Sequence, residues 1–422
     1  MVIRIAYHTL GCKVNQYETE KIRESLESAG FVTAPFGSAA DVYVINTCSV
    51  TAVADGKSRS AVRRALKLNP EAFVVVAGCY AEIAPDEIRA IEGVDLVVPN
   101  SDKAAIAERI ISRFARNSPN AQCSMLDAQS RPRLRTRAVV KVQDGCNQFC
   151  SYCIVPHARN RMTSRSVDDV LSEIRSLAQF GYKEIVLTGI RLGSYRSDTN
   201  RLPELISAAC GVDGIERVRL SSIEPWEVSD ALLETMQMPK VCRHLHIPLQ
   251  SGDDDTLRRM NRPYTSERYR AIISNVRASI PGIGITTDVI AGFPGESEQS
   301  FDNSRSLVEE LGFSRLHVFR YSARSRTPAA QMPDQVPAEV RKARAEILAE
   351  LGITAMRRFA ESLEGQTLQV LVETQSKTPN HLTGFTDNYV ETRLPGDATL
   401  KGQIVPVRIT GVDGHCATGV MC

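Results

Sequence analysis

Short apolar runs alternate with amphipathic helical patterns over the first part of the chain. Helical patterns cover residues 15–29 and 54–68, and the intervening runs rich in β-branched residues are 3–7, 42–46, 73–77 and 96–98. Strands that alternate with helices are typical of a parallel sheet with helices on its faces. We therefore predict an N-terminal parallel α/β sandwich over residues 1–116.

The same alternation resumes beyond a polar stretch, residues 117–136, in which periodicity is lost and which we interpret as a linker. A helix is predicted over residues 167–180, and the strand patterns are 138–142, 184–188, 216–220, 244–247, 285–290 and 315–319. Six β/α units are too few for a closed eight-stranded barrel. We predict a partial, open (β/α)6 barrel over residues 137–358.

A third pattern closes the chain. Residues 337–363 have helical periodicity, and β-rich runs follow at 367–372, 384–392 and 404–410. Short strands separated by turns fit a five-stranded barrel of the oligonucleotide-binding type. The predicted fold class is therefore α/β with a small C-terminal β-barrel over residues 359–422.

Composition narrows the class of protein. The chain has 422 residues, 43% of them hydrophobic, and a formal net charge of +2, so any nucleic-acid surface must be a local patch. No apolar run approaches the length of a membrane span, and no secretory signal opens the sequence. The 11 cysteines are an odd number. These features predict a cytoplasmic protein whose cysteines bind metal or take part in catalysis.

Three cysteines, Cys146, Cys150 and Cys153, lie on one short stretch directly after a predicted strand. Iron–sulfur clusters take thiolate ligands, normally four. The nearest other cysteines, Cys123 and Cys210, are distant in the sequence, so one iron would keep an open coordination position. A structural zinc site is the alternative, but no second knuckle of paired cysteines is present. We favour an iron–sulfur cluster with an open iron.

A second set of cysteines is dispersed. Cys12, Cys48 and Cys79 each follow the carboxyl end of a predicted N-terminal strand. A buried structural role would explain any one of them alone. Ligands bind outside the carboxyl ends of strands in such sheets, so three thiols in this position favour a second three-cysteine cluster.

The spacing of Cys146, Cys150 and Cys153, with Tyr152 before the last cysteine, resembles the radical S-adenosylmethionine enzymes. Together with the dispersed cysteines it resembles the methylthiotransferases, over essentially the whole chain. The resemblance implies two [4Fe-4S] clusters and two roles for S-adenosyl-L-methionine. One molecule methylates a sulfur held at the Cys12, Cys48 and Cys79 cluster. The other is reduced at the central cluster to a 5′-deoxyadenosyl radical.

Residues 9–18 look most like the branch that acts on N6-threonylcarbamoyladenosine in tRNA, because the isopentenyladenosine branch tends to have glutamine and methionine in place of Lys13 and Val14. The predicted function is insertion of a methylthio group at C2 of N6-threonylcarbamoyladenosine 37. The C–H bond at C2 is unactivated, which calls for radical chemistry. The alternatives are N6-isopentenyladenosine 37 or an aspartate of a small-subunit ribosomal protein as substrate. From another class, a non-catalytic RNA-binding protein with structural zinc is also considered.

The implied partners are a tRNA anticodon loop and an electron donor such as flavodoxin or ferredoxin; neither DNA nor a membrane is expected. The resemblance also implies that strand ends of the barrel surround S-adenosylmethionine. The candidates are Tyr152, Gly189, Ser222, Glu224, Gln250 and Asp288. Candidate tRNA-binding cations, for which simple solvent exposure is the alternative, are Lys57, Arg59, Arg63, Arg64, Arg159, Arg161 and Arg165.

Two further features of the sequence lead to predictions. His244 and His246 share a strand face, but because their strand has no carboxylate we predict packing rather than metal binding. The C-terminal module resembles a TRAM domain, yet residues 360–422 hold four basic and seven acidic side chains, a net charge of −3. Its aromatic Phe385 or Tyr389 could stack on bases, whereas phosphate binding is expected elsewhere.

Overall fold

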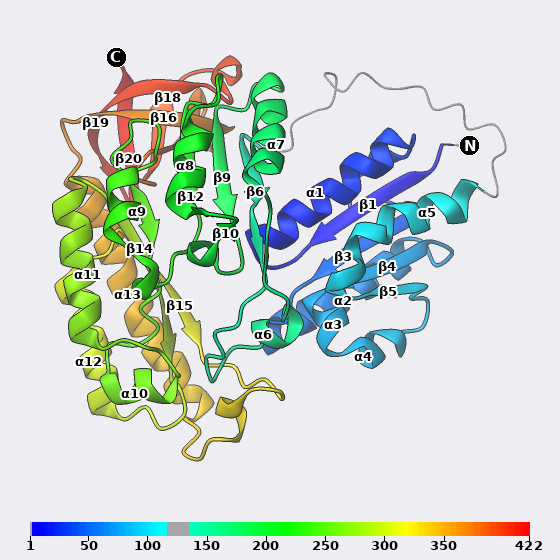
Figure 1. Cartoon of the computed structure of the whole chain (residues 1–422), viewed down its shortest axis with the longest axis horizontal. Helices are drawn as coiled ribbons and strands as arrows, with labels where there is room; N and C mark the ends of the chain where they lie inside the picture. The colour runs from blue at the N-terminus through cyan, green and yellow to red at the C-terminus, as the bar shows by residue number, and fades with distance from the viewer. Residues whose placement is uncertain (1, 116–134) are drawn as a thin grey trace. The chain divides into compact units, whose positions relative to one another are not determined.

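The structure is a computed structural model that describes residues 2–115 and 135–422 (Figure 1). The predicted linker, residues 117–136, falls almost entirely outside the described residues. Contacts divide the chain into two compact units. The first comprises Met1–Pro132, Asp144–Met162 and Ser322–Ala330, and the second comprises Arg133–Gln143, Thr163–Tyr321 and Gln331–Cys422. The cysteine loop that was predicted as part of the barrel domain thus packs in the same unit as the N-terminal sheet.

A five-stranded parallel sheet forms the centre of the first unit. Its strand order is β2-β1-β3-β4-β5. The strands are β1 (Arg4–Thr9), β2 (Val32–Ala34), β3 (Val42–Thr47), β4 (Phe73–Gly78) and β5 (Leu96–Val98). The sequence predicted four of these strands, and the sandwich is confirmed. The short edge strand β2 was missed.

Helices cover both faces of this sheet. Ile22 and Leu26 of α1 pack with Ile106 and Ile110 of α5 on one face, and Val62 of α2 packs on the other. The helices are α1 (Lys13–Ser28), α2 (Ala52–Leu68), α3 (Cys79–Ile83), α4 (Pro85–Arg89), the 3-10 helix η1 (Asn100–Ala105), α5 (Ile106–Ala115) and α6 (Val155–Ala158). A small apolar cluster joins α3 to α6 through Cys79, Ile83, Ile154 and Ala158. This cluster packs the segment that carries Cys146, Cys150 and Cys153 against helix α3 at the edge of the sheet.

The second unit contains the six predicted barrel strands as two parallel three-stranded sheets, ordered β12-β9-β6 and β13-β14-β15. The isolated bridge Ser222↔His246 connects the two sheets. The strands are β6 (Arg137–Lys141), β9 (Glu184–Thr188), β12 (Arg217–Leu220), β13 (His244–His246), β14 (Gly284–Ala291) and β15 (Arg315–Arg320). The predicted partial (β/α)6 barrel is confirmed.

A continuous apolar core lies between these strands and their helices. Leu245 and Ile285 belong to this core, together with Ile273 of α11 and Leu307 of α12. The helices are α7 (Val167–Gln179), α8 (Leu202–Cys210), α9 (Asp230–Thr235), α10 (Asp254–Arg259), α11 (Ser266–Ser279), α12 (Glu298–Leu311) and α13 (Ala338–Glu361). Because side chains alternate along a strand, the neighbouring residues His246 and Thr286 face away from the helices.

Several short elements complete this part of the chain. They are β7 (Gln143–Asp144), β8 (Thr163–Ser164), β10 (Arg196–Ser197), β11 (Asn200–Arg201), and the 3-10 helices η3 (Leu192–Ser194), η4 (Pro225–Glu227) and η5 (Pro328–Gln331). No helix among the described residues is both long enough and apolar enough to span a membrane.

The C-terminal strands close into a five-stranded barrel with the order β16-β17-β18-β20-β19. They are β16 (Thr367–Gln375), β17 (His381–Thr386), β18 (Glu391–Pro395), β19 (Ile404–Asp413) and β20 (Cys416–Met421), with the 3-10 helix η6 (Ala398–Leu400) before β19. This barrel has a core of its own, which includes Val370, Leu394 and Val407. The predicted small β-barrel is confirmed, although the predicted run 384–392 divides into the two strands β17 and β18, and β20 had not been predicted.

A buried arginine of the larger barrel, held by an ion pair, attaches the small barrel through hydrogen bonds to backbone carbonyls. Glu184 is fully buried and binds Arg219 at 2.6 Å. Arg219 also donates to the carbonyl oxygens of Thr386 at 3.2 Å and Asp387 at 3.0 Å. Burial raises the pKa of Glu184, but Arg219 and its neighbours bring it below the ordinary value. The amino-terminal end of a barrel's strands usually serves stability, which is the role of these contacts.

Candidate active site: two cysteine triplets in one unit

The dispersed triplet lies along one edge of the N-terminal sheet. Strands β1, β3 and β4 are neighbours in that sheet. Cys12 is the N-cap of α1, Cys48 follows the last residue of β3, and Cys79 follows the last residue of β4 and begins α3. All three are free thiols. The parallel arrangement therefore brings together cysteines that are far apart in the sequence.

Glycines allow the close approach of these loops. Gly11 has a φ of +95°, and a Cβ there would lie 2.8 Å from Cys48 Cβ. Gly78 has a φ of +103°, and a Cβ there would lie 2.4 Å from the Thr47 carbonyl oxygen. Both backbone conformations favour glycine, and both positions lack space for a side chain. Each glycine directly precedes a cysteine of the triplet.

The thiols of the dispersed triplet interact electrostatically. Burial raises the pKa of Cys48 to about 11; the backbone N–H of Val50 opposes this rise, and the nearby Cys79 and Cys12 add to it. The side-chain amide of Asn100 donates to Cys79 Sγ at 3.7 Å. A thiol with a raised pKa releases its proton when it binds metal. Hydrogen-bond donors to sulfur, such as the Asn100 amide, are among the groups that set the reduction potential of an iron–sulfur cluster.

The compact triplet lies on the loop between β7 and α6. Gly145 has a φ of +79°, and a Cβ there would lie 2.1 Å from the Arg161 carbonyl oxygen. The backbone N–H of Cys146 donates to the Arg159 carbonyl at 3.1 Å, and that of Gln148 donates to Cys146 Sγ at 3.4 Å. Cys150 is buried, whereas Cys146 and Cys153 are half-buried. Soft sulfur donors with a backbone N–H bonded to one of them fit an iron–sulfur cluster.

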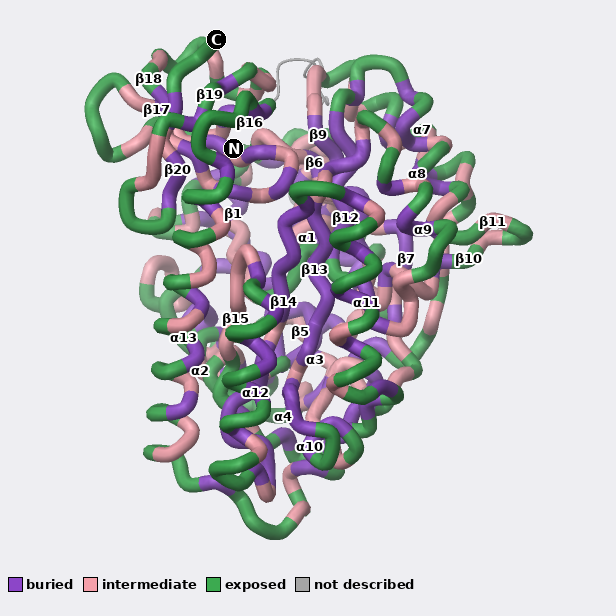
Figure 2. Tube along the Cα trace, turned by 90° about the vertical axis from the view of Figure 1, so that its left-hand side faces the viewer, coloured by how far each residue is buried: buried purple, intermediate pink, exposed green. Residues whose placement is uncertain are grey.

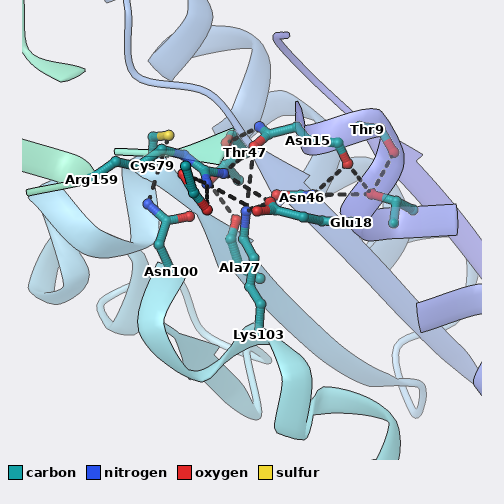
Figure 3. Close-up of polar contacts among 12 residues, drawn as sticks. Thr9, Asn15, Glu18, Asn46, Thr47, Ala77, Cys79, Asn100, Lys103 and Arg159 are labelled. Atoms are coloured by element: carbon teal, nitrogen blue, oxygen red, sulfur yellow. Dashed lines mark hydrogen bonds and ion pairs between the residues drawn. The ribbon is translucent and has the colours of Figure 1, made fainter. Parts of the chain in front are cut away.

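A buried polar network connects Arg159, which follows the loop triplet, with helix α1, which begins after Cys12; Figure 3 shows this network beside Cys79. Arg159 binds both carboxylate oxygens of Glu18, at 2.9 and 2.8 Å, and binds Asp144 at 2.8 Å. Lys103 contacts Glu18 at 2.6 Å. The Arg159 side chain is only 2% exposed. Burial lowers the pKa of Arg159, but Glu18 and Asp144 more than reverse this, so the guanidinium stays charged.

Asn15 extends this network to the strands that carry the dispersed cysteines. Its amide nitrogen donates to the carbonyls of Leu10 at 2.8 Å and Thr47 at 2.9 Å, and its oxygen accepts from Arg159 at 2.9 Å. Leu10 and Thr47 stand just before Cys12 and Cys48 in the sequence. Asn15 and Arg159 therefore hold the two cysteine-bearing segments in one framework.

Residues 322–330, far along the sequence, also pass both triplets. Arg324 donates to Ser49 Oγ at 2.8 Å, next to Cys48, and binds Asp55 at 2.5 Å. The backbone N–H of Ala329 donates to the carbonyl of Ser151, next to Cys150, at 2.8 Å. No motif singled this segment out in the sequence. Its position could only be found from the fold.

The predicted tRNA-binding cations of α2 are mostly on the surface. Lys57, Arg63 and Arg64 are exposed. Arg59 is half-buried, because its guanidinium binds the hydroxyl of Tyr80 at 2.6 Å. Three cations of this helix thus remain candidates for phosphate contact.

The cations after the cysteine loop differ in their exposure and in their carboxylate partners. Arg161 is exposed. Arg165 is bound by Asp169 at 2.6 Å and Glu173 at 2.5 Å. Arg159 is buried and bound by two carboxylates, which does not favour the prediction that it binds tRNA phosphates. Its role is to support the cysteine loops.

The candidates for S-adenosylmethionine binding are divided between the units: Tyr152 belongs to the first and the others to the second. Gly189 follows β9, where a Cβ would lie 2.8 Å from Gln143 Oε1. Ser222 is exposed, and Glu224 is bound by Arg262. These assignments stay predictions.

Gln250 has an unusual backbone, with a φ of +63°. It bonds to the next strand through its N–H, which donates to the Asp288 carbonyl at 2.8 Å, and through its carbonyl, which accepts from Ile290 at 2.9 Å. A non-glycine residue in the left-handed region is often found at a functional site. Its assignment to cosubstrate binding likewise stays a prediction.

Asp288 lies between two imidazoles that come from the flanking strands. His246 contacts one carboxylate oxygen at 3.2 Å and His317 contacts the other at 3.2 Å. Burial raises the pKa of Asp288, but these two hydrogen bonds bring it well below its ordinary value. The expectation that His246 simply packs in the core missed this cluster, because the carboxylate comes from a neighbouring strand.

The aromatic rings of the small barrel are engaged within the protein. Phe385 and Tyr389 stack at 5.0 Å between ring centroids. The Arg137 guanidinium lies over both rings, at 5.2 and 5.4 Å, and Arg219 lies 4.8 Å from the Tyr389 centroid. These rings therefore help dock the small barrel onto the strands, and the idea that they stack on bases is not supported.

Three protein families match successive parts of the chain. Residues 4–99 match the "Uncharacterized protein family UPF0004", residues 140–308 match the Radical SAM superfamily, and residues 361–421 match the TRAM domain. The three matches follow the N-terminal sheet, the partial barrel and the small closed barrel in order.

Curated relatives match over nearly the whole length. The chain is 41% identical over 420 residues to the threonylcarbamoyladenosine tRNA methylthiotransferase MtaB of Bacillus subtilis, covering 96% of this chain and 93% of the relative. The same-named protein of Thermotoga maritima is 36% identical, with 96% and 94% covered. The tRNA-2-methylthio-N(6)-dimethylallyladenosine synthase of Carboxydothermus hydrogenoformans is also 36% identical, with 95% of each chain covered.

Solved structures share the fold. The radical S-adenosylmethionine methyltransferase TsrM from Kitasatospora setae, with cobalamin and a [4Fe-4S] cluster bound, has a TM-score of 0.57 at 15% identity, covering 78% of this chain and 77% of that one. At this identity the likeness concerns the fold alone.

Proposed function

Because the chain belongs to the radical S-adenosylmethionine methylthiotransferase family, we propose that it inserts a methylthio group at C2 of N6-threonylcarbamoyladenosine 37 in tRNA. The observation that carries this proposal is full-length similarity, at 41% identity over 420 residues, to a threonylcarbamoyladenosine tRNA methylthiotransferase. The family uses a [4Fe-4S] cluster and S-adenosylmethionine. Cys146, Cys150 and Cys153 are the residues that would hold this cluster.

The proposal includes a second [4Fe-4S] cluster at Cys12, Cys48 and Cys79. Support comes from their position at the ends of adjacent strands and from the Asn100 amide that donates to Cys79 Sγ at 3.7 Å. When bound, the two clusters and S-adenosylmethionine supply the electron, the hydrogen-abstracting radical and the methylated sulfur that C2 functionalisation requires.

The protein's own residues orient and support this chemistry. Gly78 and Gly145 let the cysteine segments approach neighbouring backbone, and Gly11 lets its segment approach the Cys48 side chain. The buried Arg159 guanidinium binds Glu18 and Asp144 and so holds the cysteine-bearing segments in place. The hydrogen-bond donors to the sulfur atoms of Cys79 and Cys146 favour the more negatively charged state of a nearby cluster.

We assign tRNA binding to the first unit's exposed cations. Lys57, Arg63 and Arg64 of α2, in the helix that follows Cys48, have no equivalent in the small barrel, which is acidic overall. Phosphate contacts give affinity that is independent of sequence and sensitive to salt. A small redox protein such as flavodoxin or ferredoxin is proposed as the electron donor.

Nucleoside analysis tests the substrate assignment. Transfer RNA from cells that lack this protein should have lost 2-methylthio-N6-threonylcarbamoyladenosine and should recover it when the gene is restored. A strain complemented with the Cys150→Ser variant is the matched control and should not recover it. If this nucleoside is unchanged in the deletion strain, the substrate assignment is refuted.

The isopentenyladenosine branch is the second candidate, because a relative named for the dimethylallyl nucleoside is 36% identical over 421 residues. Purified protein offered tRNA with either modification separates the two. We expect the methylthio product on the threonylcarbamoyl substrate only. Product on the dimethylallyl substrate alone would support the second candidate.

A further inference from the structure

Strands β13, β14 and β15 bring His246, Asp288 and His317 onto one face of the second unit. In the parallel register His246 pairs with Thr286, and Asp288 pairs with His317. Thr286 and Asp288 are two residues apart on β14, so their side chains lie on the same face. The intervening residues Leu245, Ile285 and Val289 belong to the apolar core under the helices. The His–Asp–His cluster therefore lies on the face that the helices leave uncovered.

The distances within the cluster suit a single ion. His246 Nε2 lies 3.2 Å from Asp288 Oδ2, and His317 Nδ1 lies 3.2 Å from Asp288 Oδ1. The three ligand atoms all lie within 4.8 Å of one another. Nitrogen and oxygen ligands about 2.1 Å from one ion stand roughly 3 Å or more apart. Among the described residues this is the one group of histidine, cysteine and carboxylate side chains that converges so closely.

The surroundings hold one ligand in place and leave the other two side chains partly exposed. His246 Nδ1 lies 2.9 Å from Thr286 Oγ1, which also lies 3.1 Å from His244 Nε2. Metal-binding histidines usually have such a partner on the other ring nitrogen. The His246 side chain is 10% exposed, whereas those of Asp288 and His317 are 24% and 41% exposed. Figure 2 shows β13 and most of β14 as buried, whereas the residues of β15 are half-buried or exposed, so the cluster is most accessible at His317.

We propose that His246, Asp288 and His317 form a binding site for one divalent transition-metal ion, distinct from both cysteine triplets. Two imidazoles and one carboxylate are the ligand set that binds such ions while keeping positions open. With neutral imidazoles, one carboxylate and a divalent ion, the site carries a net positive charge. Its open positions therefore take an anionic oxygen ligand, such as a carboxylate.

The nature of that ligand rests on the proposed function. A threonylcarbamoyl group ends in a carboxylate, whereas a dimethylallyl group has no polar atom. An ion on the uncovered face of the barrel strands binds the first and gains nothing from the second. The site would thus be a determinant of the substrate class.

The first experiment measures metal content. The full-length protein is loaded anaerobically with its clusters, equilibrated with zinc, manganese, cobalt or nickel, and analysed for every metal, iron included. We expect it to hold about one equivalent more of one divalent metal than the Asp288→Asn and His317→Gln variants. His317 is partly exposed, so its variant is expected to fold.

The matched control is His415→Gln, which removes an exposed histidine outside the cluster and should leave the metal content unchanged. Ions bound adventitiously by cysteines contribute equally to all variants and cancel in the difference. Equal metal content in the unmodified protein and both cluster variants would overturn the proposed site. The cluster would then be a hydrogen-bonded ion pair only.

The second experiment measures the affinity for tRNA. The unmodified protein should bind tRNA with N6-threonylcarbamoyladenosine at least about tenfold more tightly than the same tRNA with unmodified adenosine, which corresponds to about 1.4 kcal/mol. His317→Gln should lose this preference and keep the affinity for unmodified tRNA. A preference that persists in this variant would refute the carboxylate role. Failure of the proposed function gives a different result: the unmodified protein would form no methylthio product on the threonylcarbamoyl substrate.

Discussion

The two cysteine triplets reach the same ligand set by different routes. Cys146, Cys150 and Cys153 lie on one loop, where Gly145 and short backbone hydrogen bonds shape the chain locally. Cys12, Cys48 and Cys79 come from the ends of three neighbouring strands. The loop triplet therefore depends mainly on local geometry, whereas the sheet triplet depends on the folding of the whole first unit.

The difference also shows where the two triplets are coupled. Arg159 lies just after the loop triplet, and its partners Glu18 and Asn15 lie on the helix that begins at Cys12. Damage to this connection should affect both triplets, whereas damage to a single cysteine should affect one. Comparing the two kinds of variant therefore distinguishes contacts that support one triplet from contacts that support both.

The largest expected effects come from the cysteines themselves. Cys150→Ser should remove about half of the bound iron and abolish the formation of 5′-deoxyadenosine under reduction. Cys48→Ser should remove a similar share of the iron, leave 5′-deoxyadenosine formation in place and stop methylthio transfer. Iron analysis and chromatography of the reaction measure both. Cys210→Ser, a buried cysteine of α8 outside the triplets, is the control. If Cys48→Ser left the iron content unchanged, the second cluster would be refuted.

Next in size is Arg159→Met, which removes the guanidinium that binds Glu18 and Asp144 in a buried network. Removing one partner of buried ion pairs costs about 3–5 kcal/mol. We expect a loss of that size in the stability of the cluster-free first unit, and less iron at both triplets. Urea unfolding and iron analysis measure these.

The control for Arg159→Met is Arg165→Met. Arg165 binds Asp169 and Glu173, and its side chain is 23% exposed. Breaking these more accessible pairs should cost about 1 kcal/mol or less. Equal losses in the two variants would contradict a special role for the buried network.

Gly78→Ala tests the sheet triplet alone. A Cβ would meet the Thr47 carbonyl oxygen at 2.4 Å in a left-handed backbone, so we expect a cost of about 3 kcal/mol. The variant should lose iron at the sheet triplet and keep 5′-deoxyadenosine formation. Gly30→Ala has a similar φ of +88° and open space around it, so it should cost only about 1 kcal/mol. Similar urea midpoints for the two variants would show that the close approach of Gly78 to the Thr47 carbonyl does not affect stability.

Lowering the pH should reduce the stability of the second unit, which contains neither cysteine triplet. Arg219 and its neighbours keep the folded-state pKa of Glu184 below the ordinary value of 4.5. The ionised carboxylate therefore adds stability above pH 4.5, and this contribution is lost as the pH falls below that value. Unfolding of the second unit, followed from pH 7 downward, should show the loss. A stability that is flat below pH 4.5 would contradict the assignment.

The smallest effect is expected from the surface. Arg63→Ser and Arg64→Ser remove exposed cations of α2 and should weaken tRNA binding by a few-fold each, with a shallower dependence on salt. The iron content should not change at either triplet. Glu71→Gln, an exposed charge just beyond the same helix, is the control. An unchanged salt dependence would remove α2 from the tRNA surface.

Much of the fold could be predicted because its strands are apolar runs with clear ends. Residues 42–46 and 73–77 were predicted as strands, and β3 and β4 are only one residue longer. The edge strand β2 was missed because two of its three residues are exposed and its pattern is short. The strand β20 was missed because Gly419 and two exposed terminal residues weaken its alternation.

The sequence by itself determined the loop triplet, since Cys146, Cys150 and Cys153 are neighbours along the chain and their spacing already defines a ligand set. It also indicated the sheet triplet, because parallel strands present their carboxyl ends at one edge. Only the tertiary structure decided the partners of Arg159, which come from Glu18 and Asp144. It also placed His246, Asp288 and His317 together. The physical reason is that strand register and helix packing, rather than sequence distance, bring these charged groups within reach of one another.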